Sequence, residues 1–317
     1  STYPLWAQLA AEAGETLLLN TGGLDFGPAD DPRLQATVRT VQASGIAHEL
    51  LSPREAEARF PQFKFDDDFT VMYQPDSGVL KASQCVLAHV RLAGQHGATL
   101  LEQTPVTGLK VIGDSVEVQT ADATYSAARL IITAGGWSAQ LLEPLGVRLP
   151  LTIQRCQEVY FQPMTQPERY TAEYPMPVFL FHTSAYGDFV AYGLPSVDGS
   201  SVKASFHGGT SVPHPDDIDY TPDTGAFIDS VRAFTRRHIP AIGESALHYT
   251  RVCLYTMTPD EHFIIDQHPE YPQVVIGSPC SGHGFKFSTL IGKILGDLAV
   301  KGSTDQDISL FNLARFA

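Results

Sequence analysis

Residues 251–266 have the sequence RVCLYTMTPDEHFIID, and residues 274–288, after a short link, have the sequence VVIGSPCSGHGFKFS. Val274, Val275 and Ile276 form a run of β-branched residues, which is typical of a buried strand. Gly282 and Gly284 follow in a loop, where they permit backbone conformations and close approaches that a Cβ would oppose. The pattern predicts a buried strand that runs into a glycine-punctuated loop.

A helix is expected directly after this loop. Ser288 is its candidate N-cap and Gly302 lies just beyond its end. Its apolar residues recur on one helical face: Leu290, Ile294 and Leu298. The free N–H groups and the positive end of the dipole favour negative charge at a helix start. Because the loop also carries Lys286, the strand, loop and helix together predict an anion-binding site, with His283 of the same loop expected to serve in packing.

The motifs CLYTMTPDEHFIID and SGHGFKFS resemble the C-terminal signature of the monomeric sarcosine oxidase and N-methyltryptophan oxidase family of FAD-dependent amine oxidases. The resemblance covers essentially the whole chain. It implies that the sulfur of Cys253 is joined to the flavin and that Lys286 binds the substrate carboxylate, with Gly282 beside it. It also implies that Gly284, Phe285 and Lys286 contact the cofactor.

Length and composition set the class of the protein. A chain of 317 residues can bury a large core, and it predicts one large domain or two interleaved ones. The formal net charge of −14 argues against nucleic acid or an anionic membrane as a partner. No apolar run is as long as a membrane span, and the N-terminus lacks a signal-peptide pattern. The widely separated cysteines indicate reduced thiols in a cytoplasmic protein: Cys85, Cys156, Cys253 and Cys280.

A second glycine-bearing element follows strands that are joined by Gly-Asp and Ala-Asp turns. Residues 130–132 form an apolar strand that leads into Ala134 and Gly135 and then into a short helix. Taken alone, an apolar strand followed by glycines is common. The resemblance matches this element to a nucleotide-contacting segment of the family, and implies that Val106, Ala134 and Gly135 contact the cofactor.

The character of the chain changes near residue 151. Short, aromatic-rich segments separated by Gly, Pro, Asp and Ser predict an antiparallel sheet. We therefore expect residues 151–249 to form a mainly antiparallel substrate domain, and residues 1–150 and 250–317 to form the FAD-binding domain. The fold implied by the resemblance is the α/β (α+β) FAD-dependent oxidoreductase fold, with the chain crossing between the two parts.

A further group of candidate residues lies in this sheet. Lys203 and His207 share one face if residues 202–206 form a strand, although alternation alone is more typical of an ordinary polar strand face. The resemblance implies that Tyr192, Lys203 and His207 lie over the flavin as catalytic residues, and it links Lys203 to oxygen activation, where a buried ammonium stabilises developing negative charge. Tyr255 matches a family residue on the substrate side.

Other chemistries are less favoured. A lone cysteine such as Cys253 is usually a small buried hydrophobe. Its place in RVCLYT favours attachment to the flavin. Attachment requires a thiolate, and the charge of Arg251 could assist its formation. His262 and His268 lie near carboxylates, but their spacing fits no zinc or calcium site, so no metal is expected. A Ser–His–Asp hydrolase would need a GxSxG elbow, and none is present.

One family feature is missing from the sequence. The family opens with a strand, a GxGxxG turn and a helix that receive the FAD pyrophosphate. Residues 1–317 contain no such fingerprint, so we expect the first βαβ unit, its ribose-binding acid and the N-terminal arginines of relatives to be absent. We further expect that this chain alone binds little flavin and associates through uncovered strand edges.

The implied activity is flavin-dependent oxidation of a secondary amine in an N-methyl amino acid such as sarcosine, with oxygen as acceptor and hydrogen peroxide as a product. The expected partners are therefore a small amino acid and oxygen, and the expected cofactor is FAD. The alternative is a catalytically silent homologue that binds a small carboxylate or a partner chain. A flavin absorbance band separates the two hypotheses.

Overall fold

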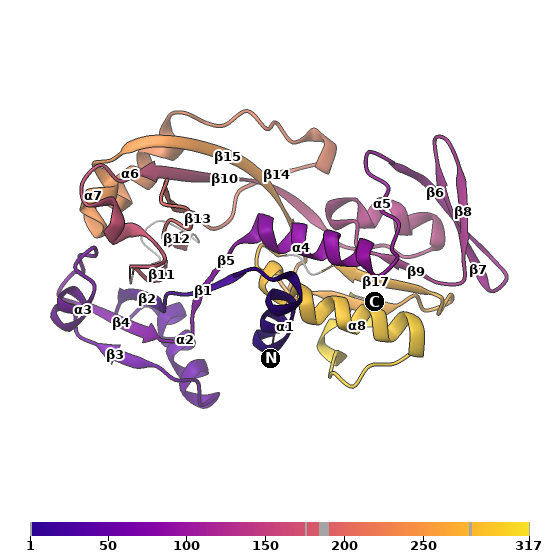
Figure 1. Cartoon of the computed structure of the whole chain (residues 1–317), viewed down its shortest axis with the longest axis horizontal. Coiled ribbons are helices and arrows are strands. Elements are labelled where there is room, and N and C mark those ends of the chain that lie inside the picture. Colours follow the sequence, from indigo (N-terminus) through magenta and orange to yellow (C-terminus); the bar gives the residue numbers. More distant parts are fainter. Residues whose placement is uncertain (1, 175, 184–189, 279–280, 317) are drawn as a thin grey trace.

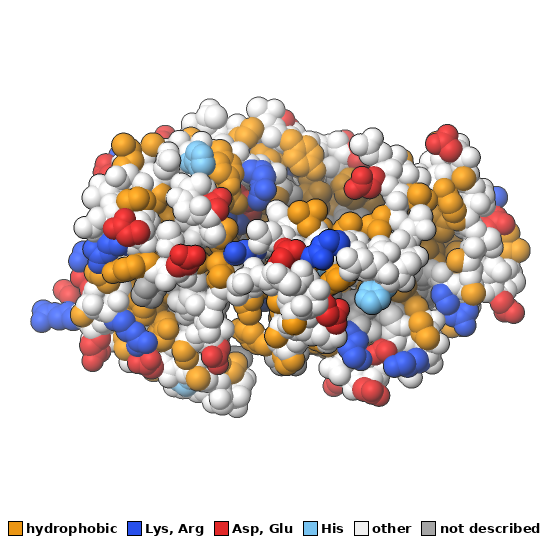
Figure 2. Space-filling model, in the orientation of Figure 1, with side chains coloured by type: hydrophobic (Ala, Val, Ile, Leu, Met, Phe, Trp, Pro, Cys, Tyr) orange, Lys and Arg blue, Asp and Glu red, His pale blue; other side chains and the backbone are white. Residues whose placement is uncertain are grey.

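The structure is a computed structural model that describes residues 2–174, 176–183, 190–278 and 281–316. A nine-stranded sheet forms one part of the molecule, and two three-stranded sheets form the other, with α1, α4 and α8 lying between and beneath them (Figure 1). This is the mixed α/β architecture that the sequence predicts. Acidic and basic side chains are interspersed over the face drawn in Figure 2, so the negative net charge is not gathered into one patch there.

The nine-stranded sheet has the order β14-β10-β13-β12-β11-β2-β4-β3, and β15 pairs with β10. All of these pairings are antiparallel except β2 with β11. The strands are β2 (Gly23–Pro28), β3 (Glu49–Leu51), β4 (Phe69–Gln74), β10 (Thr152–Gln162), β11 (Val178–Phe181), β12 (Ala191–Leu194), β13 (Val202–Phe206), β14 (Thr210–Val212) and β15 (Ala246–Met257).

The nine-stranded sheet crosses the boundaries that the sequence suggests for the domains. Its β10–β14 come from residues 151–249, but β2, β3 and β4 come from residues 23–74, and β15 runs to residue 257. The two-domain division at residues 150 and 250 therefore stays a proposal, and β2–β4 share a sheet with the strands of residues 151–249.

Three smaller sheets complete the β structure. In the first, β17 (Val274–Ser278) pairs in parallel with β9 (Leu130–Ile132) and antiparallel with β16 (Ile264–Gln267). The predicted buried strand is confirmed, because the side chains of Val274, Val275 and Ile276 are fully buried. The second is the meander of β6 (Val106–Ile112), β7 (Ser115–Thr120) and β8 (Thr124–Ala127), and the third pairs β1 (Leu18–Asn20) with β5 (Gly78–Leu80).

Local capping chemistry sets some of the helix boundaries. Ser52 and Glu55 form a capping box at the start of α3, and Gly302, with φ +75°, ends α8. None of the helices in the described ranges is long and apolar enough to cross a membrane. The helices are α1 (Tyr3–Ala13), α2 (Pro32–Ala43), α3 (Pro53–Arg59), α4 (Ala82–Gln95), α5 (Ser138–Leu142), α6 (Ala226–His238), α7 (Pro240–Gly243) and α8 (Ser288–Lys301).

The expected N-cap of α8 is wrong. Ser288 is the first residue of α8, Phe287 occupies the N-cap position, and no side chain caps the helix. A 3-10 turn, Phe285–Phe287, runs directly into α8 and satisfies part of the backbone before the helix begins. Lys286 therefore lies within a helical turn rather than in an open loop.

Helix α8 packs closely on β17 because Gly277 leaves room for it. A Cβ on Gly277 would lie 2.6 Å from Cδ1 of Leu295. Two of the three predicted face residues, Ile294 and Leu298, are buried in this contact, and Leu290 packs at its edge. The close packing fixes the turn before α8, which carries Lys286, relative to β17.

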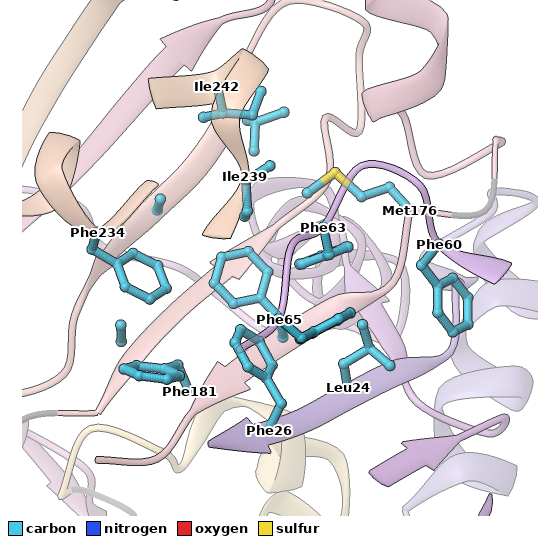
Figure 3. Close-up of a cluster of buried hydrophobic side chains, with 14 of the residues drawn as sticks. Leu24, Phe26, Phe60, Phe63, Phe65, Met176, Phe181, Phe234, Ile239 and Ile242 are labelled. Carbon is cyan, nitrogen blue, oxygen red and sulfur yellow. The ribbon is translucent and has the colours of Figure 1, made fainter. Parts of the chain in front are cut away.

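An aromatic core lies between the nine-stranded sheet and α6 (Figure 3). Phe26 of β2 is fully buried, with its ring centroid 5.1 Å from that of Phe65 and 5.2 Å from that of Phe181. Phe181 in turn lies 5.3 Å from Phe234 of α6. These contacts join β2, β11 and α6, which are distant in sequence.

Phe26→Ala should lower the free energy of unfolding by about 3–5 kcal/mol, because it leaves a large cavity among aromatic rings. Urea unfolding followed by tyrosine and tryptophan fluorescence measures the change. Tyr220→Ala is the matched control: Tyr220 is exposed, and its truncation should cost less than about 0.5 kcal/mol. Equal losses in the two variants would contradict the assignment of this core.

Candidate active site

Strand pairing gathers four of the predicted site residues, Tyr192, Lys203, Cys253 and Tyr255, on one face of the nine-stranded sheet. In the β10–β15 ladder, Glu158 lies opposite Arg251 and Cys156 lies opposite Cys253. Directly opposed residues of an antiparallel pair project to the same side, and alternate residues of one strand do so too. Tyr255 therefore shares this face with Cys253.

Strands β13 and β12 extend the same face. Lys203 lies opposite Tyr160 of β10, and Tyr192 of β12 lies opposite Ser205, two residues along from Lys203. We call the surface that carries Glu158, Tyr192, Lys203, Cys253 and Tyr255 the site face. Four strands thus contribute to it, and no two of them other than β12 and β13 are neighbours in sequence.

Lys203 is held from two sides. Its ammonium forms an ion pair with Glu158, and Nζ lies 5.0 Å from the centroid of the Tyr192 ring. Its side chain is only 14% exposed. A buried cation needs such partners, because an unpaired charge away from water is costly.

Tyr192, Tyr255 and His207 form a group of half-buried polar side chains beside Lys203. The hydroxyl of Tyr255 lies 3.3 Å from Nδ1 of His207, and the two ring centroids are 5.1 Å apart. Burial lowers the pKa of His207, so its imidazole is neutral at neutral pH. Burial also raises the pKa of Tyr192 and that of Tyr255, so both hydroxyls stay protonated. The group can therefore donate and accept hydrogen bonds without adding charge.

Gly282 brings the C-terminal loop against this group. Its φ is +75°, and a Cβ there would lie 2.5 Å from Cε2 of Tyr255 and 2.7 Å from Cε1 of His207. Only glycine satisfies both constraints. Gly284 has φ −75°, which any residue adopts, so conformational freedom explains Gly282 alone.

Lys286 follows in the 3-10 turn before α8. Nε1 of Trp6 donates a hydrogen bond of 2.9 Å to the Lys286 carbonyl, and Trp6 stacks on Phe285 at 6.0 Å, so α1 fixes the turn. Burial lowers the pKa of Lys286, and Asp25 opposes this effect. Within the described ranges its ammonium has no ion pair, although it lies near enough to His207 to lower the pKa of that imidazole. Although Lys286 is exposed at the surface, its ammonium is partly desolvated and has no ion pair in the described ranges, which suits it to binding an anion.

Cys253 is half-buried on the site face. Burial raises the pKa of its thiol, and so does Glu158, while Lys203 and Arg251 act in the opposite direction. The thiol is therefore mainly protonated at neutral pH. Arg251 directs its guanidinium to Glu158 at 2.9 Å, so its help to a Cys253 thiolate is partly offset by that carboxylate.

The predicted cofactor residues Val106 and Ala134 line one cavity of about 780 Å³, between β6 and the short helices that follow β9. Gly135 has φ +53° in the turn beside this cavity, and a Cβ on Gly136 would lie 3.1 Å from Ile153. The 3-10 turn Gly135–Trp137 also contacts β15, which carries Cys253. A largely apolar cavity approached by glycine backbone fits part of a large planar cofactor.

Some candidate residues lie elsewhere. His268 is buried, with Nε2 2.9 Å from the Leu145 carbonyl oxygen, and Nε2 of His283 lies 3.1 Å from the Glu261 carbonyl oxygen. In the described part of the chain, no group of three or more His, Cys, Asp or Glu residues could hold a metal ion. Cys280 lies outside the described residues.

Glu158 was not predicted from the sequence, yet it joins Lys203 to Arg251. It lies in the segment QRCQEVYF, where a carboxylate on the same face as a cysteine and a tyrosine could have suggested a buried charge that needs a cation. The identity of that cation depends on strand pairing, which the segment itself does not encode.

Three comparisons bear on this site. Residues 1–298 match the family described as DAO, FAD dependent oxidoreductase. The chain is 35% identical to monomeric sarcosine oxidase of Bacillus sp. (strain NS-129) over 99% of its own length and 80% of that protein. It is 31% identical to N-methyl-L-tryptophan oxidase of Yersinia pestis (strain Pestoides F), over 98% of its own length and 81% of that protein.

Solved structures give the same result for the fold. One is the open form of NikD, an unusual amino acid oxidase essential for nikkomycin biosynthesis. It superposes on this chain with a TM-score of 0.84 at 26% identity, over 98% of this chain and 81% of NikD. L-proline dehydrogenase from P. horikoshii superposes with a TM-score of 0.85 at 22% identity, over 99% of this chain and 81% of that protein, and supports the fold alone.

Gly282→Ala tests the contact of the loop with Tyr255 and His207. Gly302→Ala is its matched control, because both glycines have φ +75° but Gly302 has no atom within 4 Å of an added Cβ. We expect Gly302→Ala to cost about 1–2 kcal/mol of unfolding free energy from backbone strain. Gly282→Ala should cost about 1–3 kcal/mol more, because the Cβ collides with two rings. Urea unfolding measures both, and equal costs would contradict the close contact.

Proposed function

Because the chain belongs to the FAD dependent oxidoreductase family, we propose that it oxidises the secondary amine of a small N-methyl amino acid such as sarcosine, with oxygen as the acceptor. The names of the relatives, sarcosine oxidases and N-methyl-L-tryptophan oxidase, support this substrate class. The observation that carries the proposal is the ammonium of Lys286, which is partly desolvated, lacks an ion pair in the described ranges and lies near His207.

Lys286 binds the substrate carboxylate in this proposal. A charge-assisted hydrogen bond to a carboxylate is shorter and stronger than a neutral one, and partial desolvation of the ammonium strengthens it further. The turn at Gly282 keeps the loop against Tyr255 and His207, so the amine of a bound amino acid lies beside neutral hydroxyl and imidazole groups. These groups orient the amine without a second positive charge to repel it.

FAD, when bound, supplies the two-electron oxidation of the substrate C–N bond to an imine, which water hydrolyses to an aldehyde and an amine. Val106, Ala134 and Gly135 would hold the cofactor at the cavity, and Gly284, Phe285 and Lys286 would contact it from the C-terminal loop. Cys253 is the proposed point of covalent attachment. All of these groups belong to the proposed FAD-binding domain, residues 1–150 with 250–317, and the proposed substrate domain is residues 151–249.

Lys203 serves the reaction with oxygen. Its ammonium holds positive charge on the site face, where oxygen gains electrons on its way to hydrogen peroxide. A fixed charge in a buried site stabilises developing negative charge without reorganisation. Tyr192 supports Lys203 through its ring, and with His207 and Tyr255 it completes the proposed catalytic set.

Two further features of the protein belong to the proposal. The described cysteines Cys85, Cys156 and Cys253 are free thiols, which suits a reducing compartment such as the cytoplasm. The relatives named monomeric sarcosine oxidase favour a protein that works without a partner chain.

Lys286→Met tests both the activity and the role of this lysine. With flavin-loaded protein, sarcosine in air should yield hydrogen peroxide, and the variant should lose at least about 2 kcal/mol of carboxylate binding, or roughly thirtyfold in KM, because hydrogen bonds to charged groups are worth about that much. Lys293→Met, on the exposed side of α8, is the control. A wild-type protein without peroxide formation would refute the activity, and an unchanged KM in Lys286→Met would refute the role.

Covalent attachment through Cys253 predicts that the flavin colour stays with the protein after denaturation and gel filtration. Cys253→Ala should release the colour, whereas Cys156→Ala, directly opposite on β10, should retain it. Because the pKa of the Cys253 thiol is raised, the thiolate fraction grows with pH, so attachment to added FAD should speed up as the pH rises above neutral. Colour that washes out of the wild-type protein would contradict attachment.

A further inference from the structure

Glu158 lies at the centre of the site face, and both of its carboxylate oxygens are engaged there. Oε1 pairs with the ammonium of Lys203, and Oε2 accepts hydrogen bonds of 2.9 Å from Nη2 of Arg251 and 2.9 Å from the hydroxyl of Tyr160. Resting on the proposed role of Lys203, we propose that Glu158 positions the Lys203 ammonium for the reaction with oxygen.

Strand pairing explains why this carboxylate reaches both cations. Glu158 is on β10, with β15 on one side and β13 on the other. Arg251 lies directly opposite on β15, and Lys203 lies opposite Tyr160, two residues along β10 from Glu158. Diagonal neighbours in a sheet are within reach of long side chains. The link is therefore set by the backbone and does not depend on a mobile loop.

The carboxylate stays ionised in this position. Burial acts to raise the pKa of Glu158, but Lys203, Arg251 and Tyr160 together hold it below its usual range. One carboxylate between two cations leaves a net positive charge of about one on this part of the site face. Glu158 thus does not cancel the charge that the oxygen reaction requires.

Glu158 fixes the position of the Lys203 ammonium. A lysine side chain is a flexible four-carbon stem with a compact charge at its end. Lys203 is held between the Glu158 carboxylate and the ring of Tyr192, so Nζ has a defined place on the site face. Among the described residues, loss of the carboxylate would leave Lys203 with the weaker contact to the Tyr192 ring.

Stopped-flow measurements on flavin-loaded protein separate the two halves of the reaction. In Glu158→Gln, we expect the rate constant for reoxidation by oxygen to fall about tenfold, because a small misplacement of a catalytic group lowers the reaction rate strongly. The rate constant for anaerobic reduction by sarcosine should stay within about twofold of wild type. Glu158→Asp keeps the charge but withdraws the carboxylate by one methylene, so it should fold normally and also slow reoxidation. Thr250→Val removes a hydrogen bond of 2.7 Å to the Glu158 carbonyl oxygen and should change the rate constant of neither half-reaction.

A second measurement does not depend on flavin. Reductive methylation with formaldehyde, followed by peptide mass spectrometry, reports how readily the Lys203 amine leaves its partners. Relative to the exposed Lys110, methylation of Lys203 should be several-fold faster in Glu158→Gln and unchanged in Thr250→Val. Equal methylation in Glu158→Gln and wild type would overturn the anchoring of Lys203.

The kinetic outcomes separate this inference from the proposed function. Slow reoxidation in Lys203→Met with normal or faster reoxidation in Glu158→Gln would overturn the inference and leave the role of Lys203 standing. Normal reoxidation in Glu158→Asp with slow reoxidation in Glu158→Gln would also overturn it. The negative charge at residue 158 would then suffice, whatever the position of the carboxylate. Normal reoxidation in Lys203→Met would overturn the oxygen role itself.

Discussion

The site depends on the antiparallel pairing of β10 with β15. Their register places Glu158 opposite Arg251 and Cys156 opposite Cys253, and it is irregular only between Tyr160 and Phe161. Because side chains alternate between the two faces of a strand, a slip of one residue would move Cys253 and Tyr255 away from the site face. The register is held by the opposite face, where Ile153 and Val252 are buried in an apolar cluster with Ile218. Apolar packing on one face of the sheet therefore fixes which polar side chains meet on the other face.

The two lysines of the site differ in how their charge is balanced. Lys203 has a carboxylate partner on the protein, and the pair belongs to a network with Arg251. Lys286 is exposed at the surface, its ammonium is partly desolvated, and in the described residues it has no carboxylate within ion-pairing distance. A partly desolvated charge without a partner on the protein gains most from a ligand of opposite charge. This difference is the physical reason to assign substrate binding to Lys286 and a fixed electrostatic role to Lys203.

Close backbone approach connects the C-terminal loop to this sheet. Gly282 lets the loop touch Tyr255 and His207, and the Trp6 indole ties the following turn to α1. Gly277 similarly lets α8 pack on β17. Since protein interiors are packed as densely as organic crystals, each added Cβ at these contacts would displace its neighbours. The loop that carries Lys286 is therefore positioned by the nine-stranded sheet, by α1, and by the packing of the adjoining α8 on β17.

The sequence by itself determined the local elements and the chemistry of the motifs. The β-branched run of residues 274–276, the helix that ends at Gly302, the antiparallel character after residue 151 and the resemblance carried by Cys253 and Lys286 all follow from local patterns. Tertiary structure alone decided that β2–β4 join the same sheet as β10–β15, that Phe287 precedes α8 as its N-cap, and that Glu158 meets Lys203. Strand partners are non-local, and nothing within one segment encodes the strand that will lie beside it. A buried carboxylate requires a cationic partner, but the pairing of the strands determines which cation lies beside it.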